Sequence, residues 1–205
     1  MPAQVIDLER RTVLATDLRA EDGEGGAPLI TGHAAVFSQL SEDLGGFREQ
    51  IAPGAFASAL ERKDDVRALW NHDPNFVLGR SRAGTLEMRE DATGLAVRIA
   101  APATQTIRDL VMEPIRRGDV SQMSFAFSVR PDGDQWAEDD DGTIVRTIRD
   151  VRLYDVSPVT FAAYPQTDVS VAQRSLATAI KALRSAKNPR RLDIARRRLD
   201  LAALL

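Results

Sequence analysis

The sequence predicts an α+β protein that is mainly β: a small, mostly antiparallel β-barrel with a few helices packed on it. Three observations support this prediction. Short segments of alternating apolar and polar residues recur along the first 160 residues, and turns rich in Gly and Asp separate them. Only a few stretches have the three- and four-residue spacing of a helix. The 205 residues suffice for one domain with a substantial core and an appendage.

Residues 10–60 predict a hairpin, a loop and a short helix. Residues 10–18 alternate loosely and predict a strand, which the glycine-rich turn at 21–26 would connect to a returning strand at 29–37. A polar loop at 38–47 follows. Residues 51–60 predict a short helix, because Pro53 is tolerated in a first turn while Phe56 and Leu60 share one face. We therefore expect a hairpin followed by a loop and a helix.

The middle of the chain contains further strands and one longer helix. The predicted strands are 66–70, 76–80, and a hairpin of 85–89 with 95–99. Residues 103–117 have an apolar stripe typical of a helix, although Pro114 is expected to kink or shorten it.

The strand signal is clearest at residues 122–129. Met123, Phe125 and Phe127 share one parity, and Ser124 belongs to the other, so the two sets lie on opposite faces. The apolar set can enter a core, while the small set leaves Ser124 on an open face. An acidic loop at 132–142 follows, and then strands are expected at 143–148 and 151–156.

Charge and periodicity divide the chain into a domain at 8–170 and a basic helical tail at 171–205. From residue 174 on, nine basic residues face two acidic ones, so the tail carries about +7 and the body about −10. Leu176, Ile180 and Leu183 fit one helical face, and Asn188-Pro189 breaks the run into two segments. A tail of opposite charge suggests its own partner.

Composition excludes several classes of chemistry. The chain has no cysteine, so disulfides, thiolate zinc sites and cysteine nucleophiles are ruled out. Only two histidines are present, and we expect neither a metal nor a cofactor. No apolar run approaches the ~20 residues of a membrane span, and residues 1–11 lack the apolar segment of a signal peptide. We therefore expect a soluble cytoplasmic protein without a membrane contact.

A serine on one strand and a histidine at the end of another would supply the groups for nucleophilic acyl transfer. A serine hydroxyl needs a base to take its proton, and a neutral imidazole is the usual one. His72 ends an apolar strand at a rim, whereas His33 lies inside a strand. Spacing alone leaves Ser121 and Ser128 as rivals of Ser124.

Eight phrases in this order resemble a known family, the prohead (capsid maturation) serine proteases of tailed bacteriophages and gene transfer agents. The resemblance covers residues 10–168. Its phrases are Gly32-His33-Ala34-Ala35-Val36-Phe37, Ile51-Ala52-Pro53-Gly54-Ala55-Phe56, Leu69-Trp70-Asn71-His72-Asp73, Val77-Leu78-Gly79-Arg80, Gly94-Leu95, Arg117-Gly118-Asp119, Met123-Ser124-Phe125-Ala126-Phe127 and Asp155-Val156-Ser157-Pro158-Val159-Thr160.

The resemblance implies a barrel like that of the herpesvirus assemblins and a serine endopeptidase activity. Ser124 would be the nucleophile and His72 the general base. Asp155 matches an acidic position of the family's last motif and is the favoured third member, while Asp73, Asp119 and Asp150 stay open alternatives. His33 would be structural.

The resemblance also implies partners and a place of action. The substrates would be the major capsid protein, a scaffolding segment, and the protease itself, cut inside the procapsid in the host cytoplasm. We expect a homo-oligomer. The basic tail could bind an acidic scaffold segment, and because no aromatic platform accompanies its arginines we do not expect nucleic acid binding. The alternative is a non-catalytic assembly module that uses the barrel and the tail for protein binding.

Overall fold

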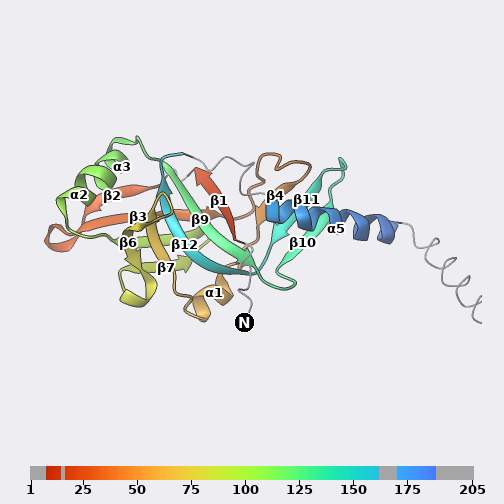
Figure 1. Cartoon of the computed structure of the whole chain (residues 1–205), viewed down its shortest axis with the longest axis horizontal. Helices are drawn as coiled ribbons and strands as arrows, with labels where there is room; N and C mark the ends of the chain where they lie inside the picture. Colours follow the sequence, from red (N-terminus) through yellow and green to blue (C-terminus); the bar gives the residue numbers. More distant parts are fainter. Residues whose placement is uncertain (1–7, 15–16, 162–169, 188–205) are drawn as a thin grey trace, which may run out of the picture.

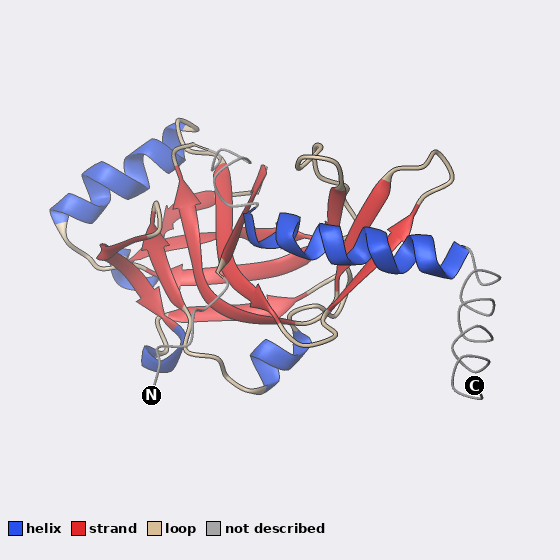
Figure 2. Cartoon of the chain, turned by 45° about the vertical axis from the view of Figure 1, so that its right-hand side comes forward, coloured by secondary structure: helices blue, strands red, loops and turns tan. Residues whose placement is uncertain are grey.

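The protein is mainly β, as predicted, with strands at the centre and helices at the periphery (Figures 1 and 2). The computed structural model describes residues 8–14, 17–161 and 170–187. The strands are β1 (Glu9–Leu14), β2 (Arg19–Asp22), β3 (Pro28–Val36), β4 (Arg48–Ile51), β5 (Arg67–Trp70), β6 (Asp73–Arg80), β7 (Leu86–Glu90), β8 (Gly94–Ala100), β9 (Gln122–Val129), β10 (Asp134–Glu138), β11 (Ile144–Ile148) and β12 (Val151–Val159).

The helices are short apart from the last. They are η1 (Glu24–Gly26), α1 (Ala57–Glu61), η2 (Ser81–Ala83), α2 (Gln105–Ile107), η3 (Arg108–Met112), α3 (Glu113–Arg117) and α5 (Ser170–Lys187). Among the described residues, no helix combines the length and apolar character needed to cross a bilayer.

The strands form three sheets. The five-stranded sheet has the order β1-β9-β12-β5-β6, and all its pairs are antiparallel except β12 with β5. The four-stranded sheet β2-β3-β8-β7 is fully antiparallel. The three-stranded sheet β10-β11-β4 lies at the end of the molecule beside α5 (Figure 1).

The two larger sheets enclose the core in the manner of an open barrel. β3 contacts β1 and β9, and β6 contacts β8, so the sheets approach each other along two lines. Their hydrogen-bonded orders do not join into one closed ring among the described strands. The mainly β, mostly antiparallel class is thus confirmed, with separate sheets in place of a closed barrel.

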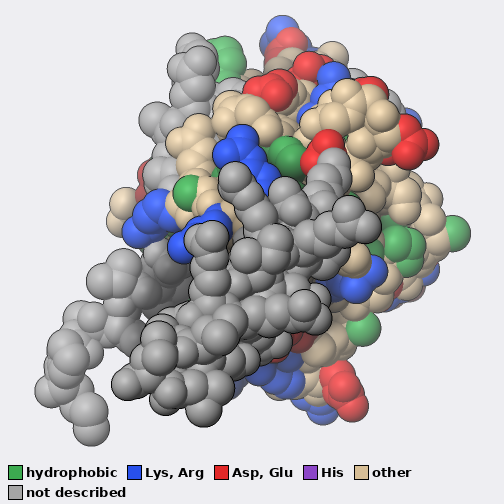
Figure 3. All heavy atoms as spheres, turned by 90° about the vertical axis from the view of Figure 1, so that its right-hand side faces the viewer, with side chains coloured by type: hydrophobic (Ala, Val, Ile, Leu, Met, Phe, Trp, Pro, Cys, Tyr) green, Lys and Arg blue, Asp and Glu red, His purple; other side chains and the backbone are tan. Residues whose placement is uncertain are grey.

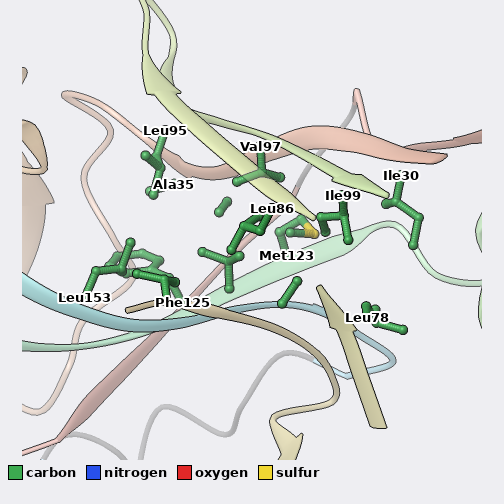
Figure 4. Packing of buried hydrophobic residues seen from close by; sticks show 14 of the residues in the cluster. Ile30, Ala35, Leu78, Leu86, Leu95, Val97, Ile99, Met123, Phe125 and Leu153 are labelled. Atoms are coloured by element: carbon green, nitrogen blue, oxygen red, sulfur yellow. The ribbon is translucent and has the colours of Figure 1, made fainter. Parts of the chain in front are cut away.

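The core fills the space between the two larger sheets. Met123 and Phe125 of β9 lie among side chains of β8 such as Leu95 and Ile99 (Figure 4), and all four are fully buried. Phe56 packs edge-on against Phe125 with 5.5 Å between ring centroids. The apolar parity of the 122–129 strand therefore faces the core as its alternation predicts.

Strand pairing near the N-terminus differs from the predicted hairpin. β1 pairs with β9, and the separate strand β2 pairs with β3 around the glycine turn. Two short strands were not expected. β4 lies where the predicted loop at 38–47 gives way to the helix predicted at 51–60, and β10 lies within the predicted acidic loop at 132–142. β4 carries the buried Glu49, and β10 is mostly exposed with Asp134 paired to Arg146, so neither sequence has the apolar alternation of an ordinary strand.

The predicted helix at 103–117 is present and continues through Pro114. The segment Arg108–Met112 is π-helical, and the amide of Glu113 bonds the carbonyl of Arg108, five residues back. Proline has no N–H to donate, and the wider π turn lets the chain continue without the usual break. The helix then ends at Gly118, whose φ of 80° suits glycine.

A buried network of charges joins β1 to the three-stranded sheet. Arg146 of β11 is 2% exposed and binds Glu9 at 2.8 Å, Glu49 at 2.9 Å and Asp134 at 2.7 Å. Arg11 binds the same two glutamates at 2.7 and 2.6 Å. Burial alone would lower the pKa of Arg146, but hydrogen bonds and charges from Glu9 and Glu49 raise it above its usual value.

Helix α5 is amphipathic and its first half packs on the body. Ala172 and Leu176 join Leu44, Phe47 and Trp136 in a second small cluster. Lys181 and Arg184 are exposed farther along the helix. The end of the molecule from which α5 projects shows basic and acidic side chains together (Figure 3). The second predicted tail segment, from residue 188 on, lies outside the described residues.

The buried network makes a testable contribution to stability. Arg146→Ala leaves Glu9 and Glu49 with one guanidinium instead of two, and we expect the free energy of unfolding to fall by about 3–5 kcal/mol. Urea denaturation measures the change. Arg98→Ala, which removes a half-exposed arginine paired with Glu87 at 3.5 Å, is the control and should change stability by less than about 0.5 kcal/mol. Equal stability of wild type and Arg146→Ala would contradict the prediction.

Candidate active site

Ser124 lies on β9, an interior strand of the five-stranded sheet, on the face opposite the core. In the ladder it stands directly across from Thr12 of β1 and Ser157 of β12. Paired residues of neighbouring strands point to the same side. Ser124 and Ser157 are both fully buried. The nucleophile candidate therefore sits on a rigid strand with small polar residues on both sides.

A β-bulge in β12 brings Asp155 to this same face. Leu153 pairs with Phe127 on the core face, and the register then shifts so that Asp155 pairs with Ala126. Without the shift, strict alternation would put Asp155 on the same side as Leu153, toward the core. The extra residue, Tyr154, lets the carboxylate turn to the face of Ser124.

His72 reaches the site from a tight two-residue turn between β5 and β6. Asn71 and His72 have φ of 53° and 58°, the left-handed conformation that such hairpin turns require. For histidine this conformation costs about 1–3 kcal/mol, so the surroundings must hold it in place. Asn71 does so: its amide N–H donates to the carbonyl of Pro158 at 3.0 Å, and its side chain bonds Thr160 twice.

The three predicted site residues form one hydrogen-bonded chain. His72 Nε2 lies 2.7 Å from Ser124 Oγ, and His72 Nδ1 lies 2.5 Å from Asp155 Oδ1. The His72 side chain is 9% exposed and that of Asp155 11%. A carboxylate only accepts, so Asp155 holds the proton on Nδ1 and leaves the Nε2 lone pair to accept from the Ser124 hydroxyl.

Ser157 completes the surroundings of the carboxylate. Its hydroxyl donates to Asp155 Oδ1 at 2.8 Å and lies 3.3 Å from His72 Nδ1. One carboxylate oxygen thus accepts from both a hydroxyl and the imidazole, which fixes the orientation of Asp155. The described residues offer no group of three or more His, Asp and Glu side chains suited to a metal ion.

The rival residues lie elsewhere. Ser121 is exposed before β9 begins, and the hydroxyl of Ser128 is 3.1 Å from that of Tyr154. Among the acidic alternatives, Asp73 accepts from the backbone of Asn75, Asp119 pairs with Arg117, and Asp150 binds Ser58.

His33 has a separate environment of its own. Nδ1 lies 2.5 Å from Asp17 and Nε2 lies 3.0 Å from Asp91. Burial by itself would lower the pKa of His33, but hydrogen bonds to the two carboxylates raise it above its ordinary value. A histidine bonded to carboxylates through both nitrogens joins the start of β2 to the β7–β8 turn.

A Ser–His–Asp arrangement of this kind is the one that serine hydrolases use for acyl transfer. A family model described as caudovirus prohead serine protease matches residues 15–182, and the chain belongs to this family. The bacteriophage T4 capsid assembly protease, gp21, is a similar solved structure at 14% identity, with a TM-score of 0.44, covering 74% of this chain and 98% of that one. No curated protein sequence matches the chain.

Sequence reasoning missed three residues that support the site. Ser157 is not among the predicted site residues, yet it lies two residues after Asp155, and period two places both on one face. Asn71 and Thr160 join the ends of two distant strands. Their pairing depends on β5 and β12 being neighbours, and no local pattern carries that information.

The two-carboxylate environment of His33 predicts a pH-dependent stability. Folding raises the pKa of His33, so the protonated ring stabilises the folded state. This stabilisation is complete below the pKa of His33 in the unfolded chain, about 6.5, and is lost as pH rises through its pKa in the folded protein. Thermal unfolding of wild type and His33→Gln should therefore differ most in mild acid and converge in alkali. A difference that is constant, or that grows with pH, would show that His33 contributes as a neutral residue.

Proposed function

We propose that this chain is a serine endopeptidase that cuts scaffold or major capsid protein segments, and itself, during procapsid maturation. The observation that carries the proposal is the hydrogen-bonded chain from Ser124 through His72 to Asp155, at 2.7 and 2.5 Å, in a member of the prohead serine protease family. Membership of the prohead protease family supports these substrates and a place of action inside the procapsid.

Acylation begins at the Ser124 hydroxyl. Oγ attacks the carbonyl carbon of a substrate peptide bond while His72 Nε2 takes the hydroxyl proton. Asp155, fixed by Ser157, stabilises the imidazolium that forms. When the tetrahedral intermediate collapses, the C–N bond breaks, His72 returns the proton to the leaving amine, and an ester joins the substrate to Ser124.

Deacylation repeats these steps with water. His72 removes a proton from a water molecule, whose oxygen attacks the ester carbonyl. The second intermediate expels Ser124 Oγ, which regains its proton from His72. The products are a new carboxylate and the free serine. Apart from water and the substrate, these proton transfers require only Ser124, His72 and Asp155, which lie at hydrogen-bond distance from one another along the chain.

The basic face of α5 supports a role in recruitment. Lys181 and Arg184 are exposed on the part of the helix beyond its packed first half. Such a surface suits an acidic scaffold or capsid segment, and attraction between opposite charges would concentrate the protease where its substrates assemble. The alternative, a non-catalytic assembly module, would use this surface without chemistry at Ser124.

Replacing the nucleophile separates these two functions. We expect wild type, co-expressed with its cognate major capsid protein and scaffold, to shorten those chains and itself. Ser124→Ala should leave all of them at full length because no acyl-enzyme can form. Intact mass spectrometry of the assembled particles reads every chain and gives the cut positions.

Ser121→Ala serves as the matched control, because this neighbouring serine is exposed and lies outside the hydrogen-bonded chain. It should cut like wild type. If wild type and Ser124→Ala both leave every chain uncut while particles still form, the assembly-module alternative holds.

The role of Asp155 is tested by a change that preserves its shape. Asp155→Asn removes the charge that orients and stabilises His72, and we expect the rate of capsid protein cleavage to fall by about 10³–10⁴-fold. Asp119→Asn, which alters an exposed aspartate paired with Arg117, is the control. Rates are followed by gel densitometry over time. A loss no larger than that of Asp119→Asn would rule out Asp155 as the third member.

A further inference from the structure

Two buried side-chain atoms lack a hydrogen-bond partner in the part of the chain that the structure describes: Nε of Arg10 and Oε1 of Gln122. Buried polar groups in native proteins are nearly always paired, so an unpaired one requires an explanation, such as a ligand that is not bound. The two atoms carry opposite hydrogen-bonding capacity. Arg10 offers a donor and Gln122 offers an acceptor.

Both residues lie on the face of Ser124, one on each side of it. Gln122 precedes Ser124 by two residues on β9, and Arg10 of β1 pairs with Ala126, two residues after Ser124. Residues two apart share a face, and paired residues do as well. At about 3.3 Å per residue, each position is about 7 Å from the nucleophile along the strand direction.

The charge on this face favours an acidic ligand. Arg67 pairs with Asp155 in the ladder and Arg152 pairs with Ser128, so both share the face with Arg10. Arg67 already binds Asp65, and the guanidinium of Arg152 lies over an aromatic ring. The carboxylate of Asp155 is engaged by the imidazole and by a hydroxyl.

The residue between Arg10 and Asp155 in the sheet is small. Ala126 is the cross-strand neighbour of both, its side chain is a single methyl group, and it is fully buried. No bulky side chain therefore stands between Arg10 and the strand that carries Asp155. Arginine binds carboxylates through planar, paired donors, which makes it selective for Asp and Glu.

We propose that Arg10 and Gln122 form the substrate-binding subsites on either side of the cleaved bond. Arg10 binds the carboxylate of an Asp or Glu located within two residues of that bond, and Gln122 Oε1 accepts a backbone N–H of the substrate on the other side. This inference rests on the proposed protease function and names its specificity. The acidic subsite would lie on β1, the edge strand of the five-stranded sheet.

Peptide profiling tests the proposal. The full-length protein is incubated with peptides from a tryptic digest of a denatured bacterial proteome, and mass spectrometry identifies the bonds cut by wild type and not by Ser124→Ala. We expect Asp or Glu to be enriched at one position within two residues of those bonds. Arg10→Gln should reduce this enrichment about tenfold or more, because a charge-assisted hydrogen bond is lost.

Three further variants separate recognition from folding. Arg10→Lys keeps the charge and should retain part of the preference. Gln122→Met should slow the cutting of all peptides alike, because its partner is backbone. Arg98→Gln, on the four-stranded sheet, should keep both rate and preference. A melting temperature for each variant identifies any that fails to fold.

The outcomes distinguish this inference from the function on which it rests. Ser124-dependent cutting without acidic enrichment, or with enrichment that Arg10→Gln and Arg10→Lys leave unchanged, overturns the acidic subsite and keeps the protease. Wild type that cuts no peptide counts against both. Acidic enrichment that depends on Arg10 establishes the subsite.

Discussion

The antiparallel ladder between β9 and β12 is the constraint on which the site depends. Its backbone hydrogen bonds put Ser124 across from Ser157 and Ala126 across from Asp155. The parallel pairing of β12 with β5 then leads into the turn that carries His72. Ser124 and Asp155 thus lie on interior strands of the sheet, where position is set by the backbone and depends little on side-chain freedom.

β1 contributes two different properties through its two faces. Glu9 and Arg11 point into the buried charge network and connect this edge strand to the three-stranded sheet. Arg10 and Thr12 lie on the face of Ser124. One short strand therefore holds the three-stranded sheet through its charges and also borders the candidate site. The charged residues of β1 would suit a solvent-exposed strand, and here they are explained by the charge network on one face and the candidate site on the other.

Local patterns predicted much of this arrangement. Alternation at 122–129 placed Ser124 opposite the apolar residues, and the end of the apolar 66–70 strand placed His72 at a rim. The sequence did not predict the pairing of β1 with β9 or the buried charge network around Arg146. The partner of β1 lies more than a hundred residues away, and the buried arginine of β11 looks in sequence like a surface residue. Pairing between distant strands is decided by the complete core, and local sequence does not encode it.

The bulge at Tyr154 means that the position of the Asp155 carboxylate is encoded in a count of residues as well as in their identity. Removing one residue from β12 between Leu153 and Asp155 would restore strict alternation and direct the acid into the core, with every side chain still present in the sequence. Related chains should therefore tolerate substitution at Tyr154 far more readily than an insertion or deletion there. Length conservation of this strand is thus a sharper criterion than its composition for recognising chains that retain the same site.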